Sequence, residues 1–152
     1  MLRFTVVSGH GPYAEPPQVF AATTLPELKS LIAAANRPDC KSDAAILCWP
    51  DDNPPPGTLL IAVYVPTGCD EGRIAGASRA PGAVLTIHVS VRNLRCPPGA
   101  GMQPAPVFSL VSVPLDRLPT GAVTVRVHYL GTLTGGPLAH QPLDAQTTVQ
   151  TG

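Results

Sequence analysis

Two segments of the chain alternate apolar and polar residues most clearly. Valines and a tyrosine occupy every second position of 123–129, with threonine, arginine and histidine between them, and 85–91 shows the same period. A period of two is typical of a strand that buries one face and exposes the other. A third segment, 58–65, is almost continuously apolar, which predicts a central strand buried on both faces.

A longer period marks one helix. The apolar positions with three- and four-residue spacing are Leu25, Leu28, Leu31, Ile32 and Ala35. Thr24 stands before them as a predicted N-cap, and Glu27 is placed to reach back to its amide. We therefore predict a helix over 25–35, with one apolar face that covers the sheet.

Turn signals separate the remaining apolar runs. Residues 77–82 read as the loop of a hairpin, and further short strands are expected at 2–7, 18–21 and 107–113. The predicted fold class is mainly β (α+β). We expect one domain over residues 1–130, built as an antiparallel β-sandwich or rolled sheet with a single covering helix.

The C-terminal segment, residues 131–152, shows neither period. Its three leucines, Leu133, Leu138 and Leu143, are spaced five apart, which fits neither a helix nor a strand. Such a segment cannot offset its ordering entropy by itself. We predict an extended C-terminal arm whose leucines dock on a neighbouring subunit or a partner protein.

Composition narrows the class of partner. The chain has 19 Pro and 14 Gly, which favours short strands and many turns, and its formal net charge is zero. Without a basic surplus we expect no nucleic-acid partner. No stretch approaches the roughly 20 apolar residues of a membrane span, so we expect no membrane insertion, and no signal peptide is recognised.

The four cysteines, Cys40, Cys48, Cys69 and Cys96, do not form the C-x-x-C spacing of a structural zinc site. An even number in Pro-rich turns fits two disulfides, and we favour Cys40 with Cys48 and Cys69 with Cys96 among the three possible pairings. Disulfides indicate an extracytoplasmic or cell-envelope location. Free thiols in a cytoplasmic or virion protein are the alternative, because no export signal is present.

No catalytic set is recognised in the sequence. Gly-x-Ser-x-Gly is missing, and Ser8 with His10 fits a polar turn better than a nucleophile and its base. His88 and His128 lie on outward faces of predicted strands and could share a metal, but a site needs three or four ligands, so solvated histidines are expected. We predict no catalytic residue, cofactor or metal.

Two further residues are candidates for an interface. Trp49 could anchor a partner or cap the local cluster around Ile46 and Leu47, since Trp is enriched at binding hot spots. Met102 lies in a Gly- and Pro-rich loop that is long enough to dock on a partner. These two residues join the leucines of the arm as interaction candidates.

The order of the motifs resembles the C-terminal domain of the PrcB family, a protease-complex subunit. The resemblance covers roughly residues 2–114 and rests on 4–7, the capped helix, Leu60-Ile61-Ala62-Val63-Tyr64-Val65-Pro66-Thr67-Gly68, Gly72-Arg73-Ile74, the strand 84–91, Cys96-Pro97-Pro98-Gly99 and 106–114. The family's Thr-Gly-Gly-Tyr turn stands here as Thr67-Gly68-Cys69-Asp70. The resemblance implies a small secreted or envelope domain that binds other proteins.

The leading hypothesis is a non-catalytic protein-interaction domain, a stabilising or accessory subunit of a cell-envelope or secreted complex. The alternative is a structural subunit that self-assembles through the C-terminal arm, as in a capsid decoration, sheath or filament. A metal-dependent enzyme ranks third, because no acid, base and nucleophile can be named together. The expected partner is another protein or a second copy of the chain.

Overall fold

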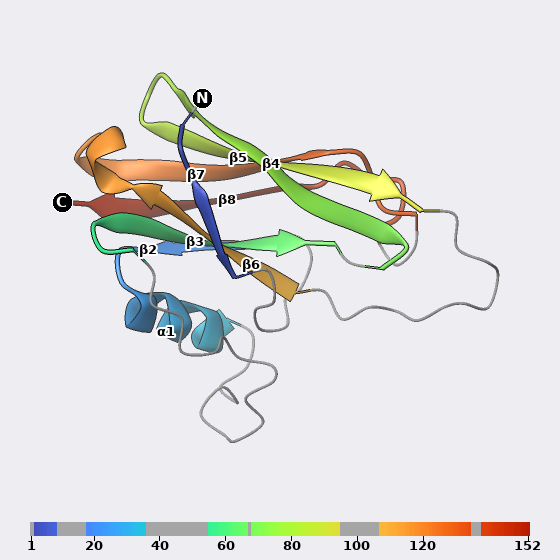
Figure 1. Cartoon of the computed structure of the whole chain (residues 1–152), viewed down its shortest axis with the longest axis horizontal. Coiled ribbons are helices and arrows are strands. Elements are labelled where there is room, and N and C mark those ends of the chain that lie inside the picture. Colours follow the sequence, from blue (N-terminus) through green and yellow to red (C-terminus); the bar gives the residue numbers. More distant parts are fainter. Residues whose placement is uncertain (1, 9–17, 36–54, 67, 95–106, 135–137) are drawn as a thin grey trace.

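The computed structural model describes residues 2–8, 18–35, 55–66, 68–94, 107–134 and 138–152. In these residues, eight strands form two four-stranded sheets, and one α-helix lies against one of the sheets (Figure 1). The prediction of a mainly β fold with one covering helix is confirmed. In the described part of the chain, no helix is long and apolar enough to span a membrane.

The first sheet, sheet A, is antiparallel throughout. Its strands are, in spatial order, β1 (Thr5–Ser8), β6 (Val107–Pro114), β3 (Thr58–Val65) and β2 (Val19–Ala22). The inner strand β3 is buried at all eight positions, because the second sheet covers one face of it and the helix packs against the other. The prediction of a central strand buried on both faces is confirmed.

The helix, α1 (Leu25–Ala35), has the predicted bounds. The Glu27 amide donates a hydrogen bond to Thr24 Oγ1 at 3.4 Å, so Thr24 is the N-cap. Leu28 and Ile32 are buried against β2 and β3, but Leu31 is 43% exposed. The prediction that Leu31 widens the buried stripe is wrong, since Leu28, Ile32 and, in part, Leu25 face the sheet while Leu31 faces solvent.

The second sheet, sheet B, contains both antiparallel and parallel pairing, so the prediction of an antiparallel sandwich or rolled sheet is corrected for this sheet. Its strands are, in spatial order, β4 (Asp70–Ala80), β5 (Val84–Asn93), β7 (Gly121–Leu130) and β8 (Asp144–Thr151). The predicted hairpin joins β4 to β5, with a turn shorter than 77–82 because both strands extend further. β5 and β7 are parallel, since the chain passes through β6 of sheet A between them. The short 3-10 helix η3 (Leu115–Arg117) follows β6.

The last strand corrects a prediction. Residues 144–151 do not form an extended arm; they form β8, which pairs antiparallel with β7 along its whole length. The residues of β8 that face the core are Ala145, Thr147, Val149 and Thr151. Alanine and threonine give these positions little apolar contrast with the outward-facing residues, so the two-residue period is difficult to recognise in the sequence.

The leucines of the supposed arm belong to the domain's own core. Leu133 and Leu143 are buried, and Leu138 is partly buried against the same cluster. The connection before β8 is held by its own backbone, as the His140 amide donates to the Leu133 carbonyl at 2.8 Å. The prediction that these leucines dock on another subunit is therefore corrected, because they fill the domain's own interior.

The core lies between the two sheets and extends between sheet A and α1. The largest side chains that are fully buried come from α1 and from strands of both sheets: Leu28, Leu59, Leu60, Ile61, Leu85, Ile87, Phe108 and Leu110. The predicted alternation holds in β5 and β7, where inward-facing residues are buried and every second side chain reaches the outer face.

Candidate functional site

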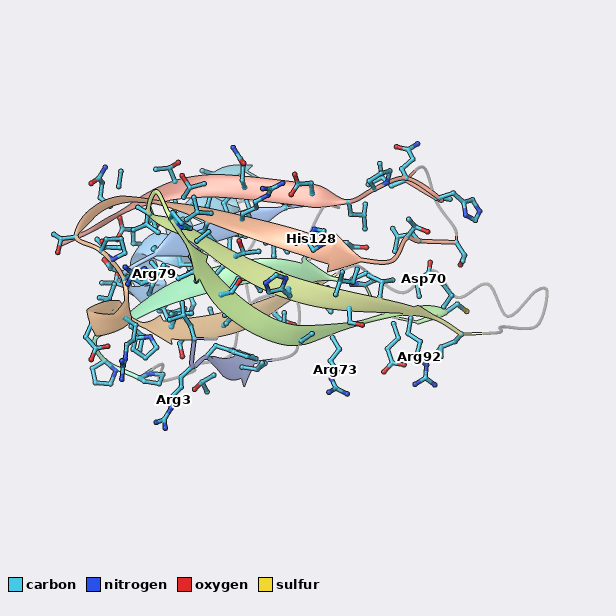
Figure 2. The ribbon with its side chains drawn as sticks, turned by 90° about the horizontal axis from the view of Figure 1, so that it is seen from above. Arg3, Asp70, Arg73, Arg79, Arg92 and His128 are labelled. Atoms are coloured by element: carbon cyan, nitrogen blue, oxygen red, sulfur yellow. The ribbon has the colours of Figure 1, made fainter. Side chains whose placement is uncertain are left out.

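The two sheets differ in what covers their outer faces. α1 packs over β2 and β3 of sheet A, whereas no element of the described chain packs over the outer face of sheet B, which Figure 2 views from above. The side chains along the middle of this face are mostly polar: Ser78, Thr86, His88, Ser90, Thr124, Arg126, His128, Asp144, Gln146 and Thr148. This face and its two margins, β4 and β8, are the candidate functional site.

Two histidines lie side by side near the middle of the face. His88 of β5 and His128 of β7 occupy the same register position of the parallel pair, and their ring centroids are 6.1 Å apart with the rings nearly perpendicular. His88 Nε2 lies 2.8 Å from the hydroxyl oxygen of Ser78 on β4. The sequence places both histidines on outward faces, but it contains no signal for their register.

A charged pair continues the row on β8. Asp144 is the register partner of His128, and its carboxylate lies 3.6 Å from the Arg126 guanidinium. Both side chains are more than half exposed, so this ion pair contributes little to stability. The row from Ser78 to Asp144 therefore combines a hydroxyl, two imidazoles and a carboxylate already paired with Arg126.

The chemistry open to this row is limited. The Ser78–His88 distance suits a nucleophile and its base, yet no hydrogen bond in the described structure joins His88 to a carboxylate that would orient the ring. Within the described ranges, no group of three or more His, Cys, Asp or Glu residues is arranged to hold a metal. Binding by polar contacts is what this face offers most directly.

A second polar cluster lies at the end of the sandwich where β4 begins. The Asp70 carboxylate accepts hydrogen bonds from Asn93 Nδ2 at 2.8 Å and from the Thr134 hydroxyl and amide at 2.7 and 2.9 Å. Asn93 Nδ2 also donates to the Thr132 carbonyl. The cluster ties the connection after β7 to the ends of β4 and β5. The residues are up to 64 positions apart, so no local pattern could have predicted it.

Two buried tyrosines join the sheets. The Tyr129 hydroxyl of β7 donates to the Tyr64 carbonyl of β3 at 2.7 Å, and their ring centroids are 6.1 Å apart. Burial and the nearby Asp70 charge raise the pKa of Tyr64 to about 12. Burial, then the neighbouring Tyr64 and Asp144, raises the pKa of Tyr129 as well. Both phenols are therefore neutral structural groups.

The margin at β4 has backbone partners. The Gly72 amide donates to the Pro66 carbonyl at 2.8 Å, and the Ala77 carbonyl accepts from the Leu2 amide at 2.9 Å. The register with β5 also shifts between Ile74 and Gly76. A strand from another molecule would meet an interrupted and partly occupied edge there.

The margin at β8 is different. The Thr124 amide of β7 donates to Ala83 beside β5, so the backbone groups of Val125 point the other way, toward its register partner Thr147. Because these directions alternate along a strand, the N–H and C=O groups of Gln146 and Thr148 point away from β7. In the described structure, no backbone hydrogen bond outside the pairing with β7 involves β8.

The other residues singled out in the sequence have mixed outcomes. Cys69 is disulfide-bonded. Its possible partners Cys40, Cys48 and Cys96 lie outside the described residues, as do Trp49 and Met102. The pairing of the cysteines and the roles of Trp49 and Met102 thus stay predictions.

The chain has no match among protein-family models, curated proteins or solved structures.

Proposed function

We propose that this chain is a non-catalytic protein-interaction domain that binds an extended segment of a partner protein along β8. It would serve as a stabilising or accessory subunit of a cell-envelope or secreted complex. The observation that carries the proposal is the contrast between the margins of sheet B, of which β4 has backbone partners beyond the sheet and β8 has none in the described structure.

The backbone groups of β8 that point away from β7 suit β-strand addition, although β2 of sheet A packs against the same strand. In this mode an extended segment pairs with a sheet edge, with affinity from main-chain hydrogen bonds and specificity from alternate side chains. β8 is eight residues long, contains no Pro or Lys and shows no register shift, and its single charge is Asp144, so it has few of the usual devices that block edge pairing. The exposed side chains of Gln146, Thr148 and Gln150 can add hydrogen bonds to the segment.

The resemblance to the PrcB family and the cysteines support the proposed compartment. Cys69 is disulfide-bonded, and disulfides persist in oxidising compartments. We propose the pairs Cys40–Cys48 and Cys69–Cys96. The intact mass of the native chain should then lie four hydrogens below that of the reduced chain. Four cysteines that react with a maleimide in the native protein would contradict this proposal.

A proline substitution on β8 tests the binding mode. Thr148→Pro removes an amide that points to the free margin, and proline is tolerated at such positions of edge strands. Thr147→Pro removes an amide that pairs with β7 and should unfold the margin. Thr148→Val keeps the amide and changes only the side chain, so it is the matched control.

The probe is a phage-displayed library of random 12-residue peptides, selected on the immobilised wild-type chain and followed by binding measurements with synthetic copies. We expect selected peptides to bind the wild type and Thr148→Val alike and to bind Thr148→Pro at least about tenfold more weakly, a difference of about 1.4 kcal/mol. Denaturation curves check that Thr148→Pro is folded. Equal binding to all three proteins, or no selected peptide, would refute the proposal.

Self-assembly is the second candidate, and the β8 sequence favours it. Residues that face outward on β8 read Gln146, Thr148, Gln150, which is symmetric about Thr148. In an antiparallel pair of two β8 strands centred there, Thr148 faces its copy and each Gln146 faces a Gln150, with no like charges opposed. Light scattering distinguishes the candidates, because self-assembly requires a wild-type dimer that Thr148→Pro abolishes, whereas a monomeric wild type rules it out.

A further inference from the structure

The histidine pair lies on the two inner strands of sheet B. His88 and His128 are carried by β5 and β7, the two inner strands of the sheet, at one register position and on the same outer face. His88 is half-buried and His128 is exposed, so solvent reaches the pair; Figure 2 shows His128 on this face. We infer that these two imidazoles together form a surface binding site for a divalent copper ion.

The separation of the rings fits a bridging metal. Two metal–nitrogen bonds of about 2 Å each, with a ring radius added at either end, span about 6 Å between ring centroids when the two nitrogens lie on opposite sides of the ion. The centroids are 6.1 Å apart in the structure. A metal ion can therefore lie between the two rings after small side-chain rotations, without a change of the backbone register.

Ser78 positions one of the two ligands. Its hydroxyl oxygen lies 2.8 Å from His88 Nε2 and accepts a hydrogen bond when that nitrogen carries the proton. Nδ1 of the same ring then holds the lone pair that a metal needs. A hydrogen bond from the second ring nitrogen to a neighbouring acceptor is the usual way in which a protein fixes a metal-binding histidine.

A site with only two imidazole ligands favours Cu²⁺ over Zn²⁺. Two imidazoles leave the other positions to water, because the described residues hold no group of three or more His, Cys, Asp or Glu suited to a metal. A structural zinc site needs four protein ligands, whereas Cu²⁺ accepts a tetragonal set of nitrogen and oxygen ligands and has the highest affinity among the divalent first-row metals. Arg126, the nearest charged neighbour along β7, is paired with Asp144, which reduces its repulsion of the ion.

The test is a titration of the untagged full chain with Cu²⁺, followed by calorimetry and by electron paramagnetic resonance. We expect one ion per chain and a spectrum with two equatorial imidazole nitrogens. His88→Gln and His128→Gln should each weaken binding about 100-fold and leave a one-nitrogen spectrum. Ser78→Ala should weaken binding about tenfold and keep the two-nitrogen spectrum, as expected for a positioning residue.

Two other histidines provide the controls. His140 lies in the turn before β8 with a φ of 60°, where asparagine is well tolerated, so His140→Asn should not change copper binding. His10→Gln should be equally silent. The inference is overturned if either control lowers the affinity as much as His88→Gln does, if His88→Gln and His128→Gln bind copper like the wild type, or if the wild-type spectrum shows a single nitrogen.

Discussion

The two edge strands of sheet B, β4 and β8, differ in how their outward-pointing backbone groups are covered. β4 is eleven residues long, and its exposed positions include Arg73 and Arg79; its backbone meets Pro66 and Leu2 beyond the sheet. β8 is eight residues long, carries Asp144 as its single charge and has no such backbone partners in the described structure. Figure 2 shows the two strands at opposite margins of the sheet.

This difference teaches where a partner strand can bind. A sheet edge with unpaired amides and carbonyls is a template for another chain, and natural proteins usually block it with charges, bulges or covering segments. β4 carries all three devices: its arginines, its register shift and the residues around Leu2 and Pro66. β8 has no register shift and no backbone hydrogen bond beyond β7 in the described structure, although β2 of sheet A packs against it and Asp144 gives it one charge. This contrast supports the proposal that β8, rather than β4, is the edge that binds a partner strand.

Deletion of residues 144–152 is the change with the largest expected effect on stability. It removes β8, one of the two edge strands being compared. Because β8 pairs with β7 along its length and Leu143 packs in the core just before it, we expect the truncated chain to lose cooperative unfolding. Total stabilities of about 5–15 kcal/mol leave little reserve for the loss of a whole strand. Urea denaturation followed by circular dichroism measures this effect. An unchanged midpoint would restore the interpretation of this segment as a docking arm.

Gly72→Ala tests the protection of β4. A Cβ at position 72 would lie 2.5 Å from Pro66 Cδ and 2.8 Å from a methyl group of Val65, so Pro66 must move away from the strand. We expect a loss of roughly 1–3 kcal/mol, as for other overpacked sites. Gly82→Ala is the control, because a Cβ there meets nothing within 4 Å and only the positive φ of 84° is strained.

If Gly72→Ala frees the edge of β4, that edge should begin to bind strands as we propose for β8. Peptides selected on Thr148→Pro combined with Gly72→Ala, but not on Thr148→Pro alone, would show that Pro66 blocks the edge. A Gly72→Ala chain with wild-type stability would show that Pro66 shifts at little cost.

The tyrosine pair gives a pH test of the contact between β7 of sheet B and β3 of sheet A. The folded state raises the pKa of Tyr64 from 10.0 to about 12 and raises that of Tyr129 too. The unfolded chain therefore releases these protons first, so their contribution is complete below pH 10 and is lost as the pH rises from 10 toward 12. The loss should reach about 1.4 kcal/mol per pH unit for each tyrosine.

Unfolding curves at pH 8 to 11 measure this slope. Tyr129→Phe removes the hydrogen bond to Tyr64, which should cost about 1 kcal/mol at pH 8. The same variant should show a shallower loss between pH 10 and 11, since one of the two titrating groups is gone. A slope equal to that of the wild type would mean that Tyr129 ionises as easily in the folded chain as in the unfolded one.

The sequence predicts the elements in which buried and exposed positions differ strongly in polarity. The alternation in β7, the apolar run of β3 and the capped helix at Thr24 are local signals, and all three hold. β8 was missed because its inward residues are mainly alanine and threonine, whose burial depends on β7 beside them. For the histidine pair, the alternation in the sequence predicts that both side chains face outward. That His88 and His128 are opposite each other depends on the parallel pairing of β5 with β7, which no local pattern predicts.

Asp144→Asn has the smallest expected effect on stability, and it tests only the contribution of charge to binding at β8. The Arg126–Asp144 pair is exposed, with 3.6 Å between nitrogen and oxygen, so the substitution should change stability by less than about 0.5 kcal/mol. The same change removes the one charge on β8, which should strengthen the binding of acidic peptides, while Asp144→Lys, a typical edge-blocking residue, should weaken the binding of basic ones. Surface plasmon resonance at 50 and 300 mM salt separates these effects, because a screened charge loses its influence at the higher concentration. Binding that is indifferent to all three residues at position 144 would place the partner segment nearer Gln150, at the far end of β8.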